Sequence, residues 1–251
     1  MNQDAIMQRY LGRLGLAAPP PPTWAGLQQL VTRHLEAIAF ENLDVMAGLR
    51  GDLTTQAVLH KVVIRGRGGF CYELNEAFGA LLIHAGFQVR RIEARVWSAP
   101  RGRFGAPFDH LALVVSLPEG EYLTDVGFGD NNRTPLRFPA DAVADVSGEY
   151  TLGQASAGLW LLSRQDRPLY EMTLAAQALE AFATMHRFHQ TSPESIFSQG
   201  LICTRATTDG RITISGDRLT VVAGGRRTQS VCADRDRALE QYFGIAREAP
   251  C

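Results

Sequence analysis

A cysteine that follows a glycine-rich approach and opens a helical pattern constrains this chain most. Residues 65–75 read Arg-Gly-Arg-Gly-Gly-Phe-Cys-Tyr-Glu-Leu-Asn, with Cys71 directly after the glycines and one phenylalanine. Beyond it, apolar residues recur with the spacing of one helix face, at Leu74, Phe78, Leu81, Leu82 and Ala85. Cys71 should therefore lie at the first turn of a buried helix, where unpaired N–H groups and the helix dipole favour a thiolate. The position suits a nucleophile, and it also suits a small buried core residue.

Length, charge and cysteine usage exclude several classes of protein. The 251 residues carry a net charge of −1, with a pI near 6.6, which argues against a dedicated nucleic-acid or membrane-surface binder. We expect no secretion signal at the N-terminus and no membrane span, because neither apolar pattern occurs. The four cysteines, Cys71, Cys203, Cys232 and Cys251, are far apart and form no CxxC pair. A disulfide framework is not indicated, and the expected location is the cytoplasm.

The periodicity of the sequence divides the chain into three parts. Up to Gly86 the apolar residues have helical spacing, which predicts a helical domain over residues 1–86. Residues 87–190 read as short strands, and residues 191–251 as a small mixed unit. In this last part we expect a three-stranded meander over 201–205, 211–215 and 218–222, followed by a helix that Asp234 opens and Gly244 ends.

A histidine and an aspartate lie at the ends of two neighbouring predicted strands. His110 opens an apolar strand, and Asp125 follows the next one, which a Pro-Glu-Gly turn joins to the first. In such a hairpin, the start of one strand lies beside the end of the next. A thiol nucleophile needs a base, and the base needs a partner that fixes its tautomer. Cys71, His110 and Asp125 supply these three roles.

Other interpretations of these three residues stay open at this point. A histidine in a strand can be a hydrogen-bonded structural residue, and an aspartate before glycine can be a turn former. Cysteine, histidine and aspartate can also bind zinc together, but no fourth ligand is evident in the sequence. We therefore predict no metal site.

The stretch Arg67-Gly-Gly-Phe-Cys-Tyr-Glu-Leu-Asn75 resembles the active-site signature of the arylamine N-acetyltransferases. The resemblance continues along nearly the whole chain, in Phe40-Glu-Asn-Leu-Asp44, Thr124-Asp-Val-Gly-Phe-Gly129, residues 191–197 and residues 243–245. It implies an α+β, cysteine-protease-like fold with a helical N-terminal domain, a β-barrel middle domain and a small α/β C-terminal lid. It also implies a triad of Cys71, His110 and Asp125 that carries an acetyl group from acetyl-CoA to an arylamine, hydrazine or hydroxylamine. Acetyl-CoA would be a co-substrate, and no cofactor would be tightly bound.

Further site residues follow from the same resemblance. Phe40, Phe70 and Phe128 are expected to line the acceptor pocket, although plain core packing is the alternative for each. Trp97 and Gly129 are expected to border the entrance for pantetheine. No phosphate-binding loop of the Walker type occurs in the sequence, so we expect CoA to be held diffusely, with help from arginines such as Arg101 or Arg103. Independently of the resemblance, Arg67 and Glu41 are expected to form a buried structural ion pair, because both lie in apolar, glycine-rich stretches; two solvated charges are the alternative.

Some positions depart from the family pattern. Asp109 precedes His110 where a small hydroxylated residue is expected, and His186-Arg-Phe188 replaces an Asn-x-Tyr pattern. These changes leave open the preference for acyl donor and acceptor. An amide synthase that closes a polyketide macrolactam is one alternative, and its acyl donor would be bound to an acyl carrier protein. A non-catalytic binding protein of the same fold is another, although the complete triad counts against it.

Overall fold

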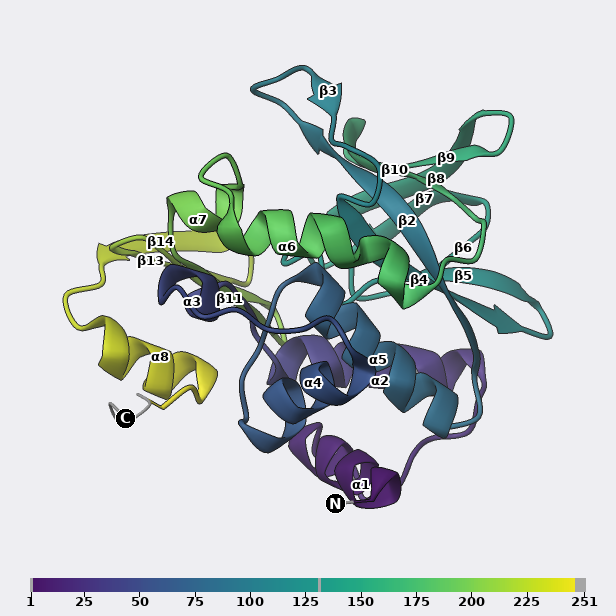
Figure 1. Ribbon diagram of the computed structural model, residues 1–251. Coiled ribbons are helices and arrows are strands. Elements are labelled where there is room, and N and C mark those ends of the chain that lie inside the picture. Colours follow the sequence, from purple (N-terminus) through teal and green to yellow (C-terminus); the bar gives the residue numbers. More distant parts are fainter. Residues whose placement is uncertain (1, 131, 247–251) are drawn as a thin grey trace.

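The computed structural model describes residues 2–130 and 132–246, and its first third is helical (Figure 1). The helices are α1 (Gln3–Arg13), α2 (Trp24–Ala37), α3 (Leu43–Met46), α4 (Thr55–Leu59) and α5 (Cys71–His84). Side-chain oxygens of Asn2, Thr23 and Thr54 cap the starts of α1, α2 and α4, which satisfies N–H groups that a helix start leaves unpaired. One π-helical turn, η1 (His60–Ile64), continues α4.

Helix α5 lies in the centre of this helical part. All of its residues from Cys71 to Leu82 are buried, including the apolar face that the sequence predicts. Its neighbours include α4 and strand β4 (His110–Leu117), so α5 forms the contact between the helices and the main sheet. Because α5 is buried along this length, its first residue, Cys71, is held in a fixed position.

The middle of the chain forms one antiparallel sheet. Its strands are β2 (Gln88–Ser98), β3 (Arg103–Phe104), β4, β5 (Gly120–Thr124), β6 (Leu136–Arg137), β7 (Ala140–Asp145), β8 (Gly148–Ser156), β9 (Leu159–Arg164) and β10 (Arg167–Thr173). The order is β6-β5-β4-β2-β10-β9-β8-β7, with β3 paired to β2. The two edge strands β6 and β7 are neighbours, so the sheet nearly closes into a barrel. Its interior is apolar and includes Ile92, Leu123, Tyr150 and Leu162.

The last part combines a second sheet with short helices. After η2 (Leu179–Phe182), α6 (Ala183–Thr191) and α7 (Ile196–Gln199) come the strands β11 (Ile202–Thr207), β12 (Gly210–Ser215), β13 (Arg218–Ala223) and β14 (Arg226–Val231), then α8 (Arg235–Phe243). The meander therefore has four strands, and the prediction of three was wrong. Every residue of β14 is exposed, so this strand carries no apolar alternation by which a sequence could reveal it.

One short strand joins the first third of the chain to the last. β1 (Phe40–Glu41) pairs antiparallel with β11, Phe40 opposite Thr204 and Glu41 opposite Cys203. The second sheet thus has the order β1-β11-β12-β13-β14. The predicted α+β class is confirmed, with a helical part, a barrel-like sheet and a mixed third part. The exact boundaries at 86/87 and 190/191 stay a prediction, and Cys251 lies outside the described residues. No helix in the described ranges is long and apolar enough to cross a membrane.

Candidate active site

The nucleophile candidate lies at the first residue of α5. Phe70 caps the helix in an extended conformation, and its N–H donates to Glu73 Oε2 at 3.1 Å. The glycines before it are required by close contacts. A Cβ at Gly68 would lie 2.0 Å from the carbonyl oxygen of Ala39, and one at Gly69 would lie 2.5 Å from Glu73 Oε2. The glycine-rich approach thus lets the backbone pass between β1 and α5 and places Cys71 at the helix start.

The structure brings His110 and Asp125 together as the predicted hairpin implies. His110 Nε2 lies 2.8 Å from Asp125 Oδ2, and their side chains are 3% and 1% exposed. The His110 side chain also hydrogen-bonds Cys71. Because Asp125 engages Nε2, Nδ1 is the ring nitrogen that remains for the thiol. The three side chains therefore form a continuous chain from sulfur to carboxylate.

Asp125 also receives hydrogen bonds from Asn75, Gly127 and Tyr170. Asn75 Nδ2 and the Gly127 N–H donate to Oδ1, each at 2.8 Å, and the Tyr170 hydroxyl donates to Oδ2 at 3.0 Å. Burial raises the pKa of Asp125. The charge of His110 and the hydrogen bonds from His110, Asn75 and Gly127 outweigh burial, so the pKa of Asp125 lies below its ordinary value. Asp125 thus carries its negative charge inside the protein, where it acts most strongly on His110.

The pKa values of His110 and Cys71 reflect this surrounding. Burial lowers the pKa of His110, but Asp125 and the hydrogen bond with Cys71 outweigh burial and raise it from 6.5 to about 10. Burial raises the pKa of the Cys71 thiol, and the hydrogen bond and charge of His110 offset only part of that increase. The helix start alone predicted a lowered pKa for Cys71, and that direction was wrong because it took no account of burial. Ionisation of Cys71 depends on transfer of its proton to His110.

The turn after Asp125 passes directly over the helix start. A Cβ at Gly127 would lie 2.8 Å from Cys71 Cα, so only glycine allows this approach. The Phe128 ring packs edge-on against His110, with the ring centroids 5.6 Å apart. Gly129 adopts a left-handed φ of 88°, and a Cβ there would lie 3.3 Å from the Phe40 ring. This turn thus connects the candidate triad to two of the aromatic residues predicted from the sequence.

The predicted acceptor residues fall into two groups. Phe40 and Phe70 both contact Phe197 of α7, with centroid distances of 5.9 and 5.3 Å. Phe128 lies elsewhere, between His110 and Tyr170. Sequence reasoning missed both Phe197 and Tyr170. No local signal marks Tyr170, because its strand β10 reaches the site only through pairing with β2.

Trp97, predicted at the CoA entrance with Gly129, lies in the β2–β3 hairpin. Its described ring contact is with Phe104, at 4.9 Å between centroids. Arg103 pairs with Ser98 in the same hairpin, and Arg101 lies in its turn. Gly129 lies at Phe40 instead, where its carbonyl oxygen accepts a hydrogen bond from Arg211. The described contacts do not join Trp97 to Gly129.

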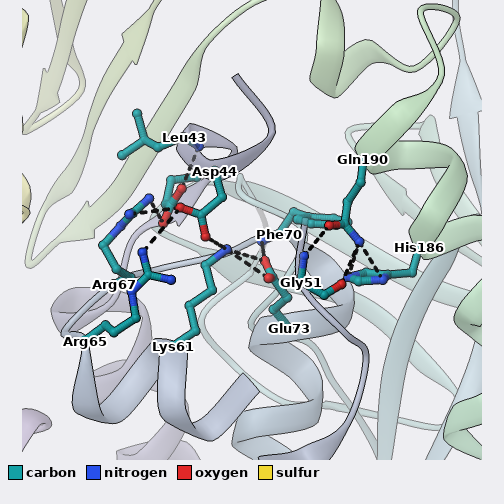
Figure 2. Close-up of polar contacts among 11 residues, drawn as sticks. Leu43, Asp44, Gly51, Lys61, Arg65, Arg67, Phe70, Glu73, His186 and Gln190 are labelled. Atoms are coloured by element: carbon teal, nitrogen blue, oxygen red, sulfur yellow. Dashed lines mark hydrogen bonds and ion pairs between the residues drawn. The ribbon is translucent and has the colours of Figure 1, made fainter. Parts of the chain in front are cut away.

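A buried network of charges reaches the start of α5 (Figure 2). Arg67 Nη2 lies 3.1 Å from Glu41 Oε1, and Arg67 Nη1 lies 3.0 Å from Asp44. Lys61, from the π-helical turn, lies between Asp44 and Glu73, with its Nζ 2.9 Å from the former and 2.8 Å from the latter (Figure 2). The network therefore extends from β1 to the carboxylate that caps α5.

A cavity of about 850 Å³ borders this network. Its lining includes Lys61, Phe70 and Glu73, and it includes none of Cys71, His110 and Asp125. The candidate triad lies outside it. No cluster of three or more histidine, cysteine, aspartate or glutamate side chains suited to a metal ion occurs in residues 2–130 and 132–246.

Both departures from the family pattern involve α6, since Asp109 contacts this helix and His186 belongs to it. Asp109 Oδ1 lies 3.3 Å from His189 Nε2, and the Nδ1 of the same histidine lies 3.1 Å from the hydroxyl of Ser195. His186 stacks on Phe70 with a centroid distance of 5.3 Å and an interplanar angle of 7°. Helix α6 therefore contacts both the residue before Cys71 and the residue before His110.

Comparison with known proteins agrees with this geometry. A family model described as N-acetyltransferase matches residues 23–250. The arylamine N-acetyltransferase of Mycobacterium tuberculosis strain H37Rv is 36% identical over 248 residues, which cover 94% of this chain and 88% of that protein.

Solved structures give the same result. The M. tuberculosis arylamine N-acetyltransferase structure superposes with a TM-score of 0.87 at 33% identity, covering 95% of this chain and 93% of that one. The structure of the Mycobacterium marinum arylamine N-acetyltransferase in complex with CoA gives 0.87 at 32% identity, over 95% and 92%. By its sequence, its fold and the arrangement around α5, the chain belongs to the arylamine N-acetyltransferase family.

Proposed function

We propose that this protein is an acyltransferase that moves an acetyl group from acetyl-CoA to an arylamine, hydrazine or hydroxylamine through a thioester on Cys71. The observation that carries the proposal is the buried chain Cys71–His110–Asp125 at the start of α5 in a member of this family. The CoA complex of the M. marinum relative supports acetyl-CoA as the co-substrate. A reducing compartment, the cytoplasm, suits a reaction that needs a free thiol at Cys71.

In the first half-reaction, Cys71 and His110 react as a thiolate–imidazolium pair, in which His110 holds the proton of the sulfur, and the thiolate attacks the thioester carbonyl of acetyl-CoA. The raised pKa of His110 keeps this proton on the imidazole, and the Asp125 carboxylate stabilises the imidazolium. N–H groups of the first turn of α5, which lie outside the helical hydrogen-bond ladder, are suited to stabilise the oxyanion. The intermediate collapses to acetyl-Cys71, and His110 returns the proton to the departing CoA thiolate.

In the second half-reaction, the amine attacks the carbonyl of acetyl-Cys71 while His110 accepts a proton from its nitrogen. The tetrahedral intermediate expels the Cys71 sulfur, which regains its proton, and the N-acetyl product leaves. The partly exposed ring of Phe128 against His110 offers a flat apolar surface to an aromatic acceptor, whereas Phe40 and Phe70 are buried around Phe197. Trp97, Arg101 and Arg103 are proposed to assist the CoA moiety at the β2–β3 hairpin.

The chemistry of the acceptor also favours arylamines and hydrazides. Alkyl amines resembling lysine, with a pKa of about 10.4, are almost wholly protonated at neutral pH and lack a free lone pair. Conjugated amines arrive neutral, and the apolar surroundings of the site penalise an ammonium ion. The named relatives do not favour the amide-synthase alternative, which would require a long carrier-bound acyl chain.

Intact-protein mass spectrometry after mixing with acetyl-CoA tests the proposal. The wild type should gain the mass of one acetyl group at Cys71, and Cys71→Ala should gain none. The acetyl group should then leave on addition of an aminobenzoate or an aryl hydrazide, and remain with lysine or a polyamine. Labelling by a long thioester mimic but not by acetyl-CoA would contradict acetyl transfer and support the amide synthase instead.

A further inference from the structure

The segment directly before His110 has an unusual backbone. Phe108 adopts a left-handed φ of 63°, a conformation that a residue with a bulky side chain rarely takes. Asp109 follows in a turn, with its N–H donating to the carbonyl oxygen of Ala106 at 3.2 Å. Regular β4 structure begins only at His110, opposite Ala94 of β2. The direction in which the His110 side chain leaves the sheet therefore depends on an irregular segment.

One side chain holds this segment from α5. The hydroxyl of Tyr72 donates to the carbonyl oxygens of Phe108 at 2.8 Å and of Asp109 at 3.0 Å. Tyr72 is fully buried. Burial, with the charges of Cys71 and Asp109, raises its pKa well above 10, so the phenol keeps the proton that it donates.

Three other contacts restrain the same residues. The Phe108 N–H donates to Glu93 Oε2 at 3.1 Å, and its ring packs edge-on against Phe182 at 5.2 Å. The Asp109 side chain pairs with His189 of α6. None of these partners is next to the nucleophile in the chain, whereas Tyr72 directly follows Cys71. Tyr72 thus joins the backbone beside the sulfur to the backbone beside the imidazole.

We propose that Tyr72 is a positioning residue for His110, since its hydroxyl holds the Phe108–Asp109 backbone in the conformation that directs the imidazole toward Cys71. The inference rests on the proposed function of Cys71 and His110. Tyr72 touches neither base nor substrate in this role and acts through the two carbonyl groups. A displacement of about 1 Å between reacting groups is enough to cost on the order of 100-fold in rate.

The test measures acylation of Cys71 by p-nitrophenyl acetate in single turnovers, with released p-nitrophenolate as the signal. Tyr72→Phe removes only the hydroxyl and should lower the acylation rate constant about 10- to 100-fold. The Kd for CoA, which reports binding of the donor without the acylation step, should change less than twofold. A purely structural role would lower the amount of folded enzyme and leave the rate constant per folded molecule unchanged.

Tyr10→Phe is the matched control. Tyr10 is also fully buried, and its hydroxyl bonds to His34 Nδ1 at 3.0 Å, away from the site. Both variants should lose comparable stability in urea unfolding, and only Tyr72→Phe should lose acylation rate. Equal rates in the two variants would overturn the proposal.

A double-mutant cycle with Phe108→Gly addresses the backbone directly. Glycine adopts a positive φ without strain, so the segment then needs less restraint. The fold-loss in acylation rate caused by Tyr72→Phe should therefore be at least threefold smaller in the Phe108→Gly background than in the wild type. Loss of the contact between Phe108 and Phe182 is common to both members of the Phe108→Gly background, so it cancels in the cycle. Additive effects would overturn the role in holding the segment. A wild type that is not acylated at Cys71 would instead refute the proposed function.

Discussion

Two buried groups of charged side chains meet the first turn of α5, and they differ in what they control. The first, Asp125 with His110, comes from the barrel-like sheet and ends at the Cys71 sulfur. The second, which we call the supporting network, consists of Glu41, Asp44, Lys61, Arg67 and Glu73 and ends at the Phe70 N–H. In both groups, opposite charges lie close together and are buried, so neither the distance between the charges nor their burial distinguishes one group from the other.

The two groups differ in whether a cationic side chain can lose its proton. The supporting network joins two permanently cationic side chains, Lys61 and Arg67, to carboxylates, and such pairs fix the backbone between them. The site joins Asp125 to a histidine, whose proton can move to and from a neighbouring sulfur. A buried ion pair becomes catalytic machinery when one partner can give up its charge during the reaction.

The largest expected effect follows from Asp125→Asn. The amide keeps the shape of the side chain but loses the charge that stabilises the His110 imidazolium, so kcat/KM for acetyl transfer should fall about 10⁴-fold. Asp234→Asn is the control, because asparagine caps α8 as well as aspartate does. A loss of less than tenfold with Asp125→Asn would remove the distinction between the two groups.

Arg67→Met tests the supporting network. Glu41 is fully buried, and loss of its partner should destabilise the fold by roughly 3–5 kcal/mol in urea unfolding. The matched control is Arg90→Met, whose partner Glu121 is 41% exposed and where a change within about 1 kcal/mol is expected. If both variants lose the same stability, the supporting network does not hold the fold as proposed.

The third prediction concerns pH. The folded pKa of His110 is raised from 6.5 to about 10, so its pairing stabilises the fold fully below pH 6.5 and this contribution is lost as pH rises through 10. Asp125 has a lowered pKa, so its contribution is present above 3.8 and is lost on further acidification. The stability difference between wild type and His110→Gln should therefore be larger at pH 5.5 than at pH 10.5.

His34 gives the opposite sign and serves as the control. Burial lowers its pKa to about 3, so the unfolded chain binds this proton first and stability falls as pH drops below 6.5. The difference between wild type and His34→Gln should shrink at pH 5 relative to pH 8. A common trend for both histidines in urea titrations would contradict the assignment of their environments.

The smallest expected effect separates the two aromatic groups around the site. Phe128→Leu removes the ring that packs against His110 and is proposed to contact the acceptor. Loss of an aromatic contact with the arylamine, worth about 0.5–1.5 kcal/mol, should raise KM for the arylamine roughly 2- to 12-fold. Phe104→Leu, in the β2–β3 hairpin, is the control for loss of a ring away from His110. Equal KM values for wild type and Phe128→Leu would exclude Phe128 from acceptor binding.

Part of this organisation is predictable from the sequence. The helix of Cys71 has an apolar face with regular spacing, and the short turn between β4 and β5 requires His110 and Asp125 to be neighbours. Asn75 was also within reach of sequence reasoning, because it follows Cys71 by one helical turn. Tyr170 was not, because pairing between β10 and β2 is a property of the whole sheet. The raised pKa of Cys71 likewise results from burial by segments distant in sequence.

The pairing of β1 with β11 affects when during synthesis this protein can become active. The Ile202 N–H donates to Asn42 Oδ1 across 160 residues, directly beside the two strands. At about 5–20 residues per second, a ribosome needs roughly 8–30 seconds to pass from one partner to the other. During that interval Phe40 and Glu41, which contact the glycine approach to Cys71, lack their strand partner. Once residue 125 has been made, the nascent chain carries Cys71, His110 and Asp125, but the frame around them is completed only after β11 has followed.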